Sequence, residues 1–300
     1  MEVDGRQIAI THPGKILFPR DRVTKSDLAE YYRRIAPLML PHVRNRPLVL
    51  QRFPDGIEKP GFIQKAVAAY YPSWIRRVKV KKAGGQVEHV VADDAATLVY
   101  LANQACVTLH TWLSCADDVE HPDELVLDFD PSRDNDLASV VAGALTAREL
   151  LEELDMPAFV RSTGSRGVHV VSPLDGKQDF DTVRAFARRL AEIIVDRDTG
   201  RFTLEAHKVN RQGRVYVDIN RNGYAQSAVA SYAVRARAGA PVAVPLDWAE
   251  LRKKNFRPDA FTIATIFNRI EKVGDPWKDF ARRRVSLRAA DRKLSRLHAA

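Results

Sequence analysis

Glu124-Leu-Val-Leu-Asp-Phe-Asp-Pro-Ser132 is the stretch of this 300-residue chain that decides the fold. Apolar residues recur at every second position, and successive side chains of a β-strand point to opposite faces. The residues that this pattern turns toward a core are Leu125, Leu127 and Phe129. The residues that share the opposite face are Val126, Asp128 and Asp130. Because divalent cations such as Mg²⁺ prefer carboxylate oxygen, two aspartates on one face of a strand end indicate a metal site.

A second stretch, Arg214-Val-Tyr-Val-Asp-Ile-Asn220, repeats the alternation far downstream. Its inward residues are Val215, Val217 and Ile219, and its outward residues are Tyr216 and Asp218. If the two strands are neighbours, Asp218 joins the first two carboxylates. Three carboxylates in a basic protein suit nucleotidyl transfer with two bound metal ions. The alternative is that the Asp-x-Asp pair before Pro131 forms only a solvent-facing turn.

The composition limits the class of protein. Hydrophobic residues make up 45% of the chain, enough for a substantial core. The 47 Lys and Arg outnumber the 38 Asp and Glu, and the net charge of +9 favours a polyanionic partner such as nucleic acid. No run approaches about 18 apolar residues and the first residues contain no apolar signal core, so we expect a cytoplasmic protein without membrane association.

Cysteine usage argues against a disulfide framework. The cysteines are Cys106 and Cys115, and reduced thiols within the core are the preferred interpretation. The alternative is a zinc site made by Cys106, His110, Cys115 and His121. Their spacing lacks the paired short knuckles that are typical of structural zinc sites.

The rest of the pattern predicts alternating strands and helices. Strands are expected at residues 8–10, 48–52, 87–91, 158–162 and 168–171. Helices are expected from the capping box of Thr24 and Asp27 to about Pro41, and over residues 93–108, 137–154 and 181–196. The spacing is not that of regular βαβ units and no repeat is visible. We therefore expect an α+β fold with mainly antiparallel sheets flanked by helices.

The turn Ser162-Thr-Gly-Ser-Arg-Gly-Val-His169 is a candidate triphosphate cradle, because it combines hydroxyls, glycines, a guanidinium and an imidazole. Arg221 and Arg235 are further candidate ligands for the leaving pyrophosphate. The alternative for the turn alone is an ordinary glycine turn with an exposed arginine.

The first quarter of the chain interleaves cations with aromatic residues, namely Lys15, Lys25, Arg52, Phe53, Phe62 and Lys65. Aromatic rings beside cations suit an unpaired base and its phosphate, although a helix surface explains lysines equally well. His110, which follows a predicted helix, reads by itself as a structural histidine.

Together these segments resemble the polymerase domain of bacterial ATP-dependent DNA ligase D, in the archaeo-eukaryotic primase superfamily. The similarity extends over nearly the whole chain and depends on the order of its motifs. The segments that carry it are residues 15–19, 24–26, 46–47, 61–65, 128–130, 162–169, 218–222 and 240–248.

The resemblance implies a primase-like catalytic core and a template-dependent, primer-extending polymerase that prefers ribonucleotides. It implies gap filling and end processing in double-strand break repair by non-homologous end joining, with two divalent ions, Mn²⁺ or Mg²⁺. The implied partners are DNA with ends, gaps or overhangs, nucleoside triphosphates, a Ku-like end binder and a separate DNA ligase. The polymerase domain would cover residues 1–281, with a DNA-binding and 5′-phosphate-binding part over about 1–110, a catalytic part over about 110–281 and a basic tail over 282–300.

The resemblance also implies roles for individual residues. The catalytic metal ligands would be Asp128, Asp130 and Asp218. The nucleotide would be bound by His110 near the sugar and by Thr163, Ser165, Arg166, His169, Arg221 and Arg235 on the triphosphate. A downstream 5′-phosphate would be bound by Lys15 and Lys25, and the template by Arg52, Phe62 and Lys65.

The chain departs from the family pattern at three positions. Arg166 stands where lysine is common, Ile63 where a second aromatic is frequent, and His12 where asparagine is frequent. One alternative function is a primase that needs no primer. Another is a non-catalytic module that binds and bridges DNA ends, although acidic groups that repel DNA phosphates would serve such a module poorly.

Overall fold

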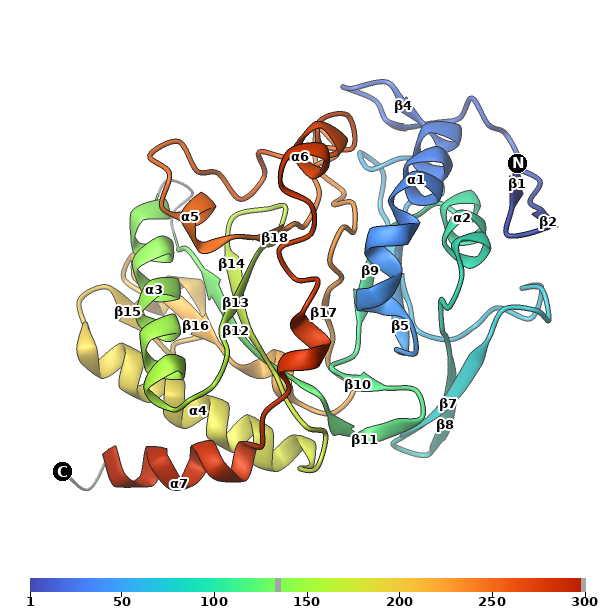
Figure 1. Cartoon of the computed structure of the whole chain (residues 1–300). Helices are drawn as coiled ribbons and strands as arrows, with labels where there is room; N and C mark the ends of the chain where they lie inside the picture. The colour runs from blue at the N-terminus through green and yellow to red at the C-terminus, as the bar shows by residue number, and fades with distance from the viewer. Residues whose placement is uncertain (133–135, 298–300) are drawn as a thin grey trace. The chain divides into compact units, whose positions relative to one another are not determined.

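The computed structural model describes residues 1–132 and 136–297. Within this part, the chain forms two compact units that interleave along the sequence (Figure 1). Unit 1 contains Met1–Val119, Ser227–Val244 and Phe261–Lys272. Unit 2 contains Glu120–Gln226, Pro245–Ala260 and the chain from Val273 onward.

Unit 1 is built on a sheet with the strand order β17-β9-β5-β6, in which neighbours are antiparallel. Its strands are β5 (Leu48–Arg52), β6 (Phe62–Gln64), β9 (Cys106–Thr111) and β17 (Ala228–Val229). Helices α1 (Lys25–Val43) and α2 (Ala95–Asn103) pack together, and α2 also contacts β9. Antiparallel ribbons are formed by β1 (Glu2–Val3) with β2 (Arg6–Gln7), β3 (Ile16–Phe18) with β4 (Val23–Thr24), and β7 (Arg77–Lys82) with β8 (Gly85–Val90). Strands β10 (Ser114–Cys115) and β11 (Asp118–Pro122) pair where the chain passes into unit 2, and α6 spans Ile266–Val273.

Helix α1 starts as predicted, because Thr24 and Asp27 form a capping box in which each side chain accepts from the backbone N–H of the other residue. The predicted end near Pro41 is confirmed to within two residues, since the helix ends at Val43. A proline removes one backbone donor, but the fully buried Met39 and Val43 hold the chain helical on both sides of Pro41.

The predicted helix over residues 93–108 is wrong at its end. Asp94 caps α2 by accepting from the Thr97 backbone N–H, but the helix stops at Asn103. Ala105 then adopts a positive φ of 54°, which a helix does not allow. The residues that follow pair with Leu48–Arg52 as strand β9, so tertiary pairing overrides the local preference. The expected strand at residues 8–10 is absent too: that segment lies outside the ribbon of β1 and β2.

Unit 2 is built on a sheet with the strand order β15-β16-β12-β14-β13-β18. Its strands are β12 (Glu124–Asp130), β13 (Phe159–Ser162), β14 (Val168–Pro173), β15 (Phe202–Thr203), β16 (Val215–Asp218) and β18 (Pro245–Leu246). The pair of β15 and β16 is parallel, and the other pairs are antiparallel. The expected α+β fold with mainly antiparallel sheets is confirmed.

Helices α3 (Leu137–Glu153) and α4 (Phe180–Arg197) pack against this sheet (Figure 1). A Cβ on Gly143 of α3 would lie 2.7 Å from the ring of Phe129, so the glycine allows the helix to approach the apolar face of β12. The predicted inward direction of Phe129 is therefore confirmed, and the carboxylates of β12 project from the face away from α3.

The remaining elements of unit 2 are short, except for the last helix. They are η1 (Lys208–Asn210), η2 (Asn220–Asn222), α5 (Trp248–Leu251), η3 (Phe280–Arg283) and α7 (Leu287–Leu297). Within the expected basic tail, α7 buries Leu287, Ala290 and Leu294, and Arg189 of α4 forms an ion pair with Asp291. The last part of that tail, residues 298–300, lies outside the described residues.

Candidate active site

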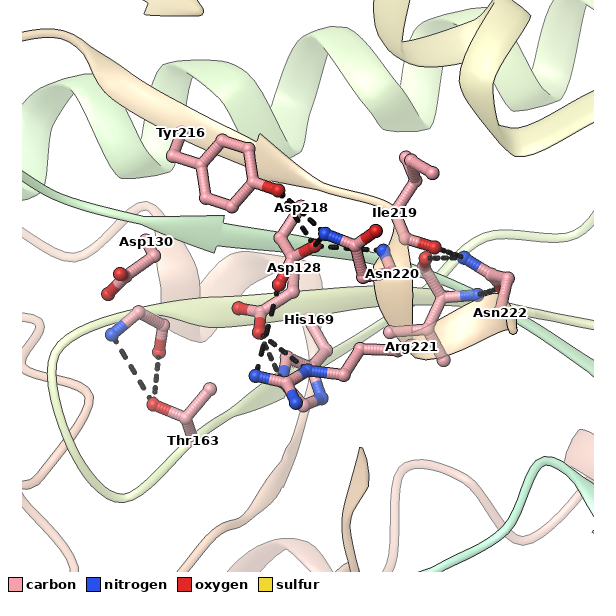
Figure 2. Close-up of polar contacts among 12 residues, drawn as sticks. Asp128, Asp130, Thr163, His169, Tyr216, Asp218, Ile219, Asn220, Arg221 and Asn222 are labelled. Carbon is pink, nitrogen blue, oxygen red and sulfur yellow. Dashed lines mark hydrogen bonds and ion pairs between the residues drawn. The ribbon is translucent and has the colours of Figure 1, made fainter. Parts of the chain in front are cut away.

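The two carboxylate strands are neighbours, as the sequence predicts. Strands β12 and β16 pair antiparallel, with Asp128 opposite Asp218 and Asp130 opposite Tyr216 (Figure 2). Asp128 and Asp130 lie two residues apart in one strand, so they share a face. The sheet register therefore places all three carboxylates on one face of the sheet in unit 2.

Asp128 is the most buried of the three, with 8% of the residue exposed. Its Oδ2 lies 3.4 Å from Nε2 of His169 and 3.5 Å from Nε of Arg221. Burial alone would raise the pKa of Asp128, but the contacts with His169 and Arg221 outweigh it and lower the pKa to about 2. The side chain is therefore a carboxylate throughout the neutral range.

His169 is held by Arg161, which lies opposite it in the pairing of β13 with β14. Nη2 of Arg161 lies 3.0 Å from Nδ1 of His169. Because a guanidinium only donates, Nδ1 must accept, which assigns the ring proton to Nε2, toward Asp128. Burial lowers the pKa of His169 despite the nearby carboxylate. A neutral imidazole therefore connects the buried Arg161 to Asp128.

Asp130 lies nearer to solvent and is paired with two arginines. Its oxygens lie 3.3 Å from Nη1 of Arg211 and 3.6 Å from Nη2 of Arg166. Arg211 is only 5% exposed, stacks 4.5 Å from the centre of the Tyr216 ring, and donates to the carbonyl oxygens of Glu205 and Ala206. The loop that carries η1 is thereby tied to this carboxylate.

Asp218 uses its two oxygens differently (Figure 2). Its Oδ1 accepts from the backbone N–H of Asn220 at 2.8 Å, from Nδ2 of Asn220 at 2.8 Å and from the Tyr216 hydroxyl at 3.1 Å. Its Oδ2 lies 3.9 Å from Nη2 of Arg221. Arg221 therefore bridges Asp218 and Asp128.

The candidate phosphate turn packs directly on the end of β12. The Thr163 hydroxyl donates to the carbonyl oxygen of Gly167 at 2.9 Å and accepts from its N–H at 3.3 Å, which closes the turn. Gly164 has a positive φ of 62°. A Cβ on Gly167 would lie 2.2 Å from the Phe129 carbonyl oxygen, so only glycine fits. Of the other predicted ligands in the turn, Arg166 reaches Asp130 and Ser165 is half-buried.

The other predicted site residues belong to unit 1. They are Lys15, Lys25, Arg52, Phe62, Lys65, His110 and Arg235. His110 is half-buried in β9 opposite Val49 and Val229, and Arg235 is half-buried.

Two lysines of unit 1 and Arg52 form a cationic cluster. Lys25 is only 7% exposed, and its Nζ donates to the Thr11 hydroxyl at 3.3 Å. Burial lowers the pKa of Lys25, and the charges of Lys15 and Arg52 lower it further, so each of these two cations lies close enough to repel Lys25. Lys15 is also paired with Asp55 at 2.8 Å. Such a cluster of cations suits a phosphate group.

An exposed patch lies on the sheet-edge strand β6 of unit 1. Phe62 and Ile63 are 47% and 53% exposed. The guanidinium of Arg52 lies 5.4 Å from the centre of the Phe62 ring and donates to Gln64. Lys65 is exposed just beyond the strand. An exposed aromatic ring can stack on an unpaired base, and a neighbouring cation can contact its phosphate.

The donor set in unit 2 fits Mg²⁺ or Mn²⁺, which favour carboxylate oxygen. In residues 1–132 and 136–297, however, no three His, Cys, Asp or Glu side chains converge closely enough to hold one ion. Each of the three carboxylates is instead paired with arginine, since Arg221 bridges Asp128 and Asp218, and Arg211 and Arg166 pair with Asp130.

Cys106, a member of the alternative zinc cluster, lies fully buried in β9. Burial raises the pKa of its thiol to about 12. Zinc is bound by thiolate, so this site favours the interpretation of Cys106 as a core residue.

Several residues in the site are absent from the sequence-based assignment, namely Arg161, Arg211, Tyr216, Asn220 and Asn222. Arg161 carried a detectable signal, because a charged residue in an otherwise apolar strand needs a buried partner. Asn222, which is fully buried, binds both the N–H and the carbonyl of Val126. Val126 shares the face of the aspartates but is fully buried.

Comparisons with known proteins identify the class. A family model described as LigD, primase-polymerase domain, matches residues 24–277. The solved polymerase domain from Mycobacterium tuberculosis ligase D, in complex with DNA, superposes with a TM-score of 0.87 at 27% identity, covering 93% of this chain and 99% of that one. The fold and the site thus define a DNA-directed nucleotidyltransferase of the polymerase type.

Curated relatives agree with this class. The multifunctional non-homologous end joining protein LigD of Pseudomonas aeruginosa is 31% identical over 288 residues, which are 95% of this chain and 34% of that protein. The LigD of Mycobacterium bovis is 30% identical over 278 residues, and the bifunctional LigD of Bacillus subtilis 28% over 277. The chain belongs to the LigD primase-polymerase domain family, which confirms the resemblance seen in its motifs. It spans 34% to 44% of the length of these three relatives. No helix in the described residues is both long and apolar enough to cross a membrane.

Proposed function

We propose that this protein is a template-dependent, primer-extending polymerase that fills gaps and processes DNA ends in bacterial double-strand break repair by non-homologous end joining. The observation that carries the proposal is the register of β12 and β16, which sets Asp128 opposite Asp218 with Asp130 on the same face. The names of the curated relatives connect the family to end joining.

Asp128, Asp130 and Asp218 are the proposed ligands of two divalent ions, Mn²⁺ or Mg²⁺. When bound, such ions polarise the attacking hydroxyl and neutralise triphosphate charge. The protein itself holds the carboxylates in position. His169 and Arg221 keep Asp128 ionised, and the shared bridge of Arg221 holds two carboxylates together against their mutual repulsion.

The nucleotide is proposed to bind at the turn between β13 and β14. Thr163, Ser165, Arg166 and His169 come from this hairpin, and Arg221 from η2. Guanidinium groups suit phosphate because they present several donors in a fixed plane. The proposed roles of His110 beside the sugar, with preference for ribonucleotides, and of Arg235 on the triphosphate rest on the family resemblance of their segments.

DNA binding is proposed for unit 1. The cluster of Lys15 and Lys25 would bind a downstream 5′-phosphate, and Arg52, Phe62 and Lys65 would contact the template. Support comes from the close packing of cations around Lys25 and from the exposed Phe62 ring beside Arg52. A Ku-like end binder and a separate ligase are the proposed protein partners, and the bacterial chromosome is the proposed place of action.

A gapped duplex with a recessed primer and a downstream 5′-phosphate tests the proposal. Asp128→Asn and Asp218→Asn should abolish primer extension and retain DNA binding, since phosphate contacts come from other residues. Asp196→Asn, a change at an exposed position of α4, is the matched control and should extend like the parent. Extension by Asp128→Asn and Asp218→Asn at the rate of the parent would reject the proposed site, whereas DNA binding without extension by the parent itself would favour the non-catalytic end-binding module.

The same assay separates the finer alternatives. Omitting the primer tests for a primase, since product without primer would contradict obligatory primer extension. Comparing ribonucleotides with deoxyribonucleotides, each with Mn²⁺ and with Mg²⁺, should give the fastest extension for ribonucleotides with Mn²⁺. Equal rates for both sugars would remove the proposed preference and leave the polymerase assignment intact.

A further inference from the structure

The two oxygens of Asp218 have unequal surroundings. Oδ1 accepts three hydrogen bonds, from the backbone and side-chain nitrogens of Asn220 and from the Tyr216 hydroxyl. In the part of the chain that the structure describes, Oδ2 has only the 3.9 Å ion pair with Arg221. Each carboxylate oxygen has about two lone-pair directions. The three hydrogen bonds therefore use the full acceptor capacity of Oδ1, whereas Oδ2 can still accept a further donor or a cation.

Asn220 is itself oriented by helix α4. Nη2 of Arg184 lies 2.9 Å from Oδ1 of Asn220. A guanidinium only donates, so it fixes the amide oxygen on its own side and turns Nδ2 toward Asp218. The amide nitrogen lies 2.9 Å from the Tyr216 hydroxyl oxygen as well. Arg184, Asn220 and Tyr216 therefore form one connected network that ends on a single carboxylate oxygen (Figure 2 shows the latter two).

The network borders a pocket of about 410 Å³ between α4 and β16. Arg184, Asn220 and Tyr216 line it together with Arg188, which is one turn further along α4. Arg188 pairs with Glu192 at 2.9 Å, whereas Arg184 donates to Asn220, so the two arginines have different partners although they share a helix face.

We propose that Tyr216, Asn220 and Arg184 are positioning residues for a cation. They saturate Oδ1 of Asp218 and hold the carboxylate so that Oδ2 is the oxygen presented to a divalent ion. This inference rests on the proposed function, because it specifies how one of the proposed metal ligands is oriented. Partners that orient a metal ligand typically contribute about tenfold to hundredfold in metal affinity.

Direct binding of Mn²⁺ to the DNA-free protein tests the inference, with the free ion followed by electron paramagnetic resonance. Asn220→Ala removes the amide and keeps the backbone donor, and should weaken Mn²⁺ binding by about tenfold to hundredfold. Tyr216→Phe removes one donor and keeps the ring that stacks on Arg211, so a smaller loss is expected. Arg184→Gln should weaken binding, Arg184→Lys should restore it in part, and Arg188→Gln should leave it unchanged.

Extension of the gapped duplex provides a second readout. The Mn²⁺ concentration for half-maximal extension should rise in Tyr216→Phe and Asn220→Ala, and saturating Mn²⁺ should restore the maximal rate. A general loss of structure would instead lower the rate at every concentration. Far-UV circular dichroism checks folding, and if Asn220→Ala does not fold, Tyr216→Phe decides the question because it deletes a single hydroxyl.

Asp218→Asn separates this inference from the proposed function. If Asp218→Asn loses Mn²⁺ binding and extension while Tyr216→Phe and Asn220→Ala bind like the parent, the positioning role is overturned and the polymerase proposal stands. An equal effect of Arg184→Gln and Arg188→Gln also overturns the role of Arg184. If Asp218→Asn extends like the parent, the proposed active site itself fails.

Discussion

Asn222→Ala should destabilise unit 2 more than any other single amide truncation near the site. The side chain is fully buried, and its Nδ2 donates to the carbonyls of Val126 at 2.7 Å and Ile219 at 2.9 Å. Its Oδ1 accepts from the N–H of Val126 at 2.8 Å. Beyond Asp218 the chain leaves the sheet for η2, so this amide replaces the missing strand partner of β12.

The size of the effect follows from these contacts. Three net hydrogen bonds at about 1 kcal/mol each give a loss of about 3 kcal/mol, and backbone groups left buried without a partner raise it toward 5 kcal/mol. Asn222→Asp should be no better than alanine, because a carboxylate accepts from Val126 but faces two carbonyl oxygens that it cannot bind.

Urea denaturation measures the free energy of unfolding, with Asn210→Ala as the control. Asn210 is an exposed amide in η1, and its truncation should change stability by less than about 0.5 kcal/mol. An Asn222→Ala midpoint equal to that of the parent, with an unchanged denaturant slope, would refute the argument that this amide pairs β12. The variant should also lose extension, because Asn222 ties the segment after Asp218 to the strand of Asp128.

Three further changes have definite expected results. Gly167→Ala places a Cβ 2.2 Å from the backbone oxygen of Phe129 and should lower the free energy of unfolding by about 1–3 kcal/mol. Gly14→Ala is the control, because the space around Gly14 is open, and it should leave the free energy of unfolding unchanged. Burial lowers the pKa of His89 below 6.5 in the folded protein. The stability that depends on the neutral imidazole is therefore present above pH 6.5 and is lost as the pH falls toward the lowered pKa. Melting temperatures at pH 7.5 and 5.5 should differ less in His89→Gln than in the parent. Lys25→Ala should abolish the tighter binding of a gapped duplex with a 5′-phosphate over its hydroxyl counterpart, and an undiminished difference would reject the proposed phosphate pocket.

The central strands of unit 2 were predictable because their alternation is strict. Once the two strands are adjacent with their apolar residues on one side, Asp128 and Asp218 lie on the same face of the sheet, and the apolar side of Phe129 requires a covering helix. Alternation determines only the face of each residue. The residue opposite Asp128 depends on how the whole sheet assembles, which no local pattern specifies.

The errors lie where tertiary contacts override local preference. Residues 104–108 continue an apolar pattern that suits a helix, yet the positive φ of Ala105 ends α2 and the following residues complete a sheet. The end of α1 was predicted more closely, but the buried Val43 still carries the helix two residues past Pro41, which lacks a backbone donor. In both cases the residues that determine the end of the helix are packing partners from elsewhere in the sequence. The residues next to the helix end are therefore not enough to predict it.

The arginines of the site illustrate the same limit in electrostatic terms. The sequence assigns Arg166 and Arg221 to the triphosphate, and the structure places them on Asp130 and on the pair of Asp128 and Asp218. A guanidinium keeps its charge at any physiological pH and binds carboxylate and phosphate by the same donors. The local sequence therefore shows that an arginine will bind an anion, but it does not show whether that anion is a carboxylate or a phosphate. A cluster of three carboxylates is tolerable before any cation arrives only if such groups balance it, so the arginines that suit a triphosphate are also the ones that allow the carboxylates to lie together.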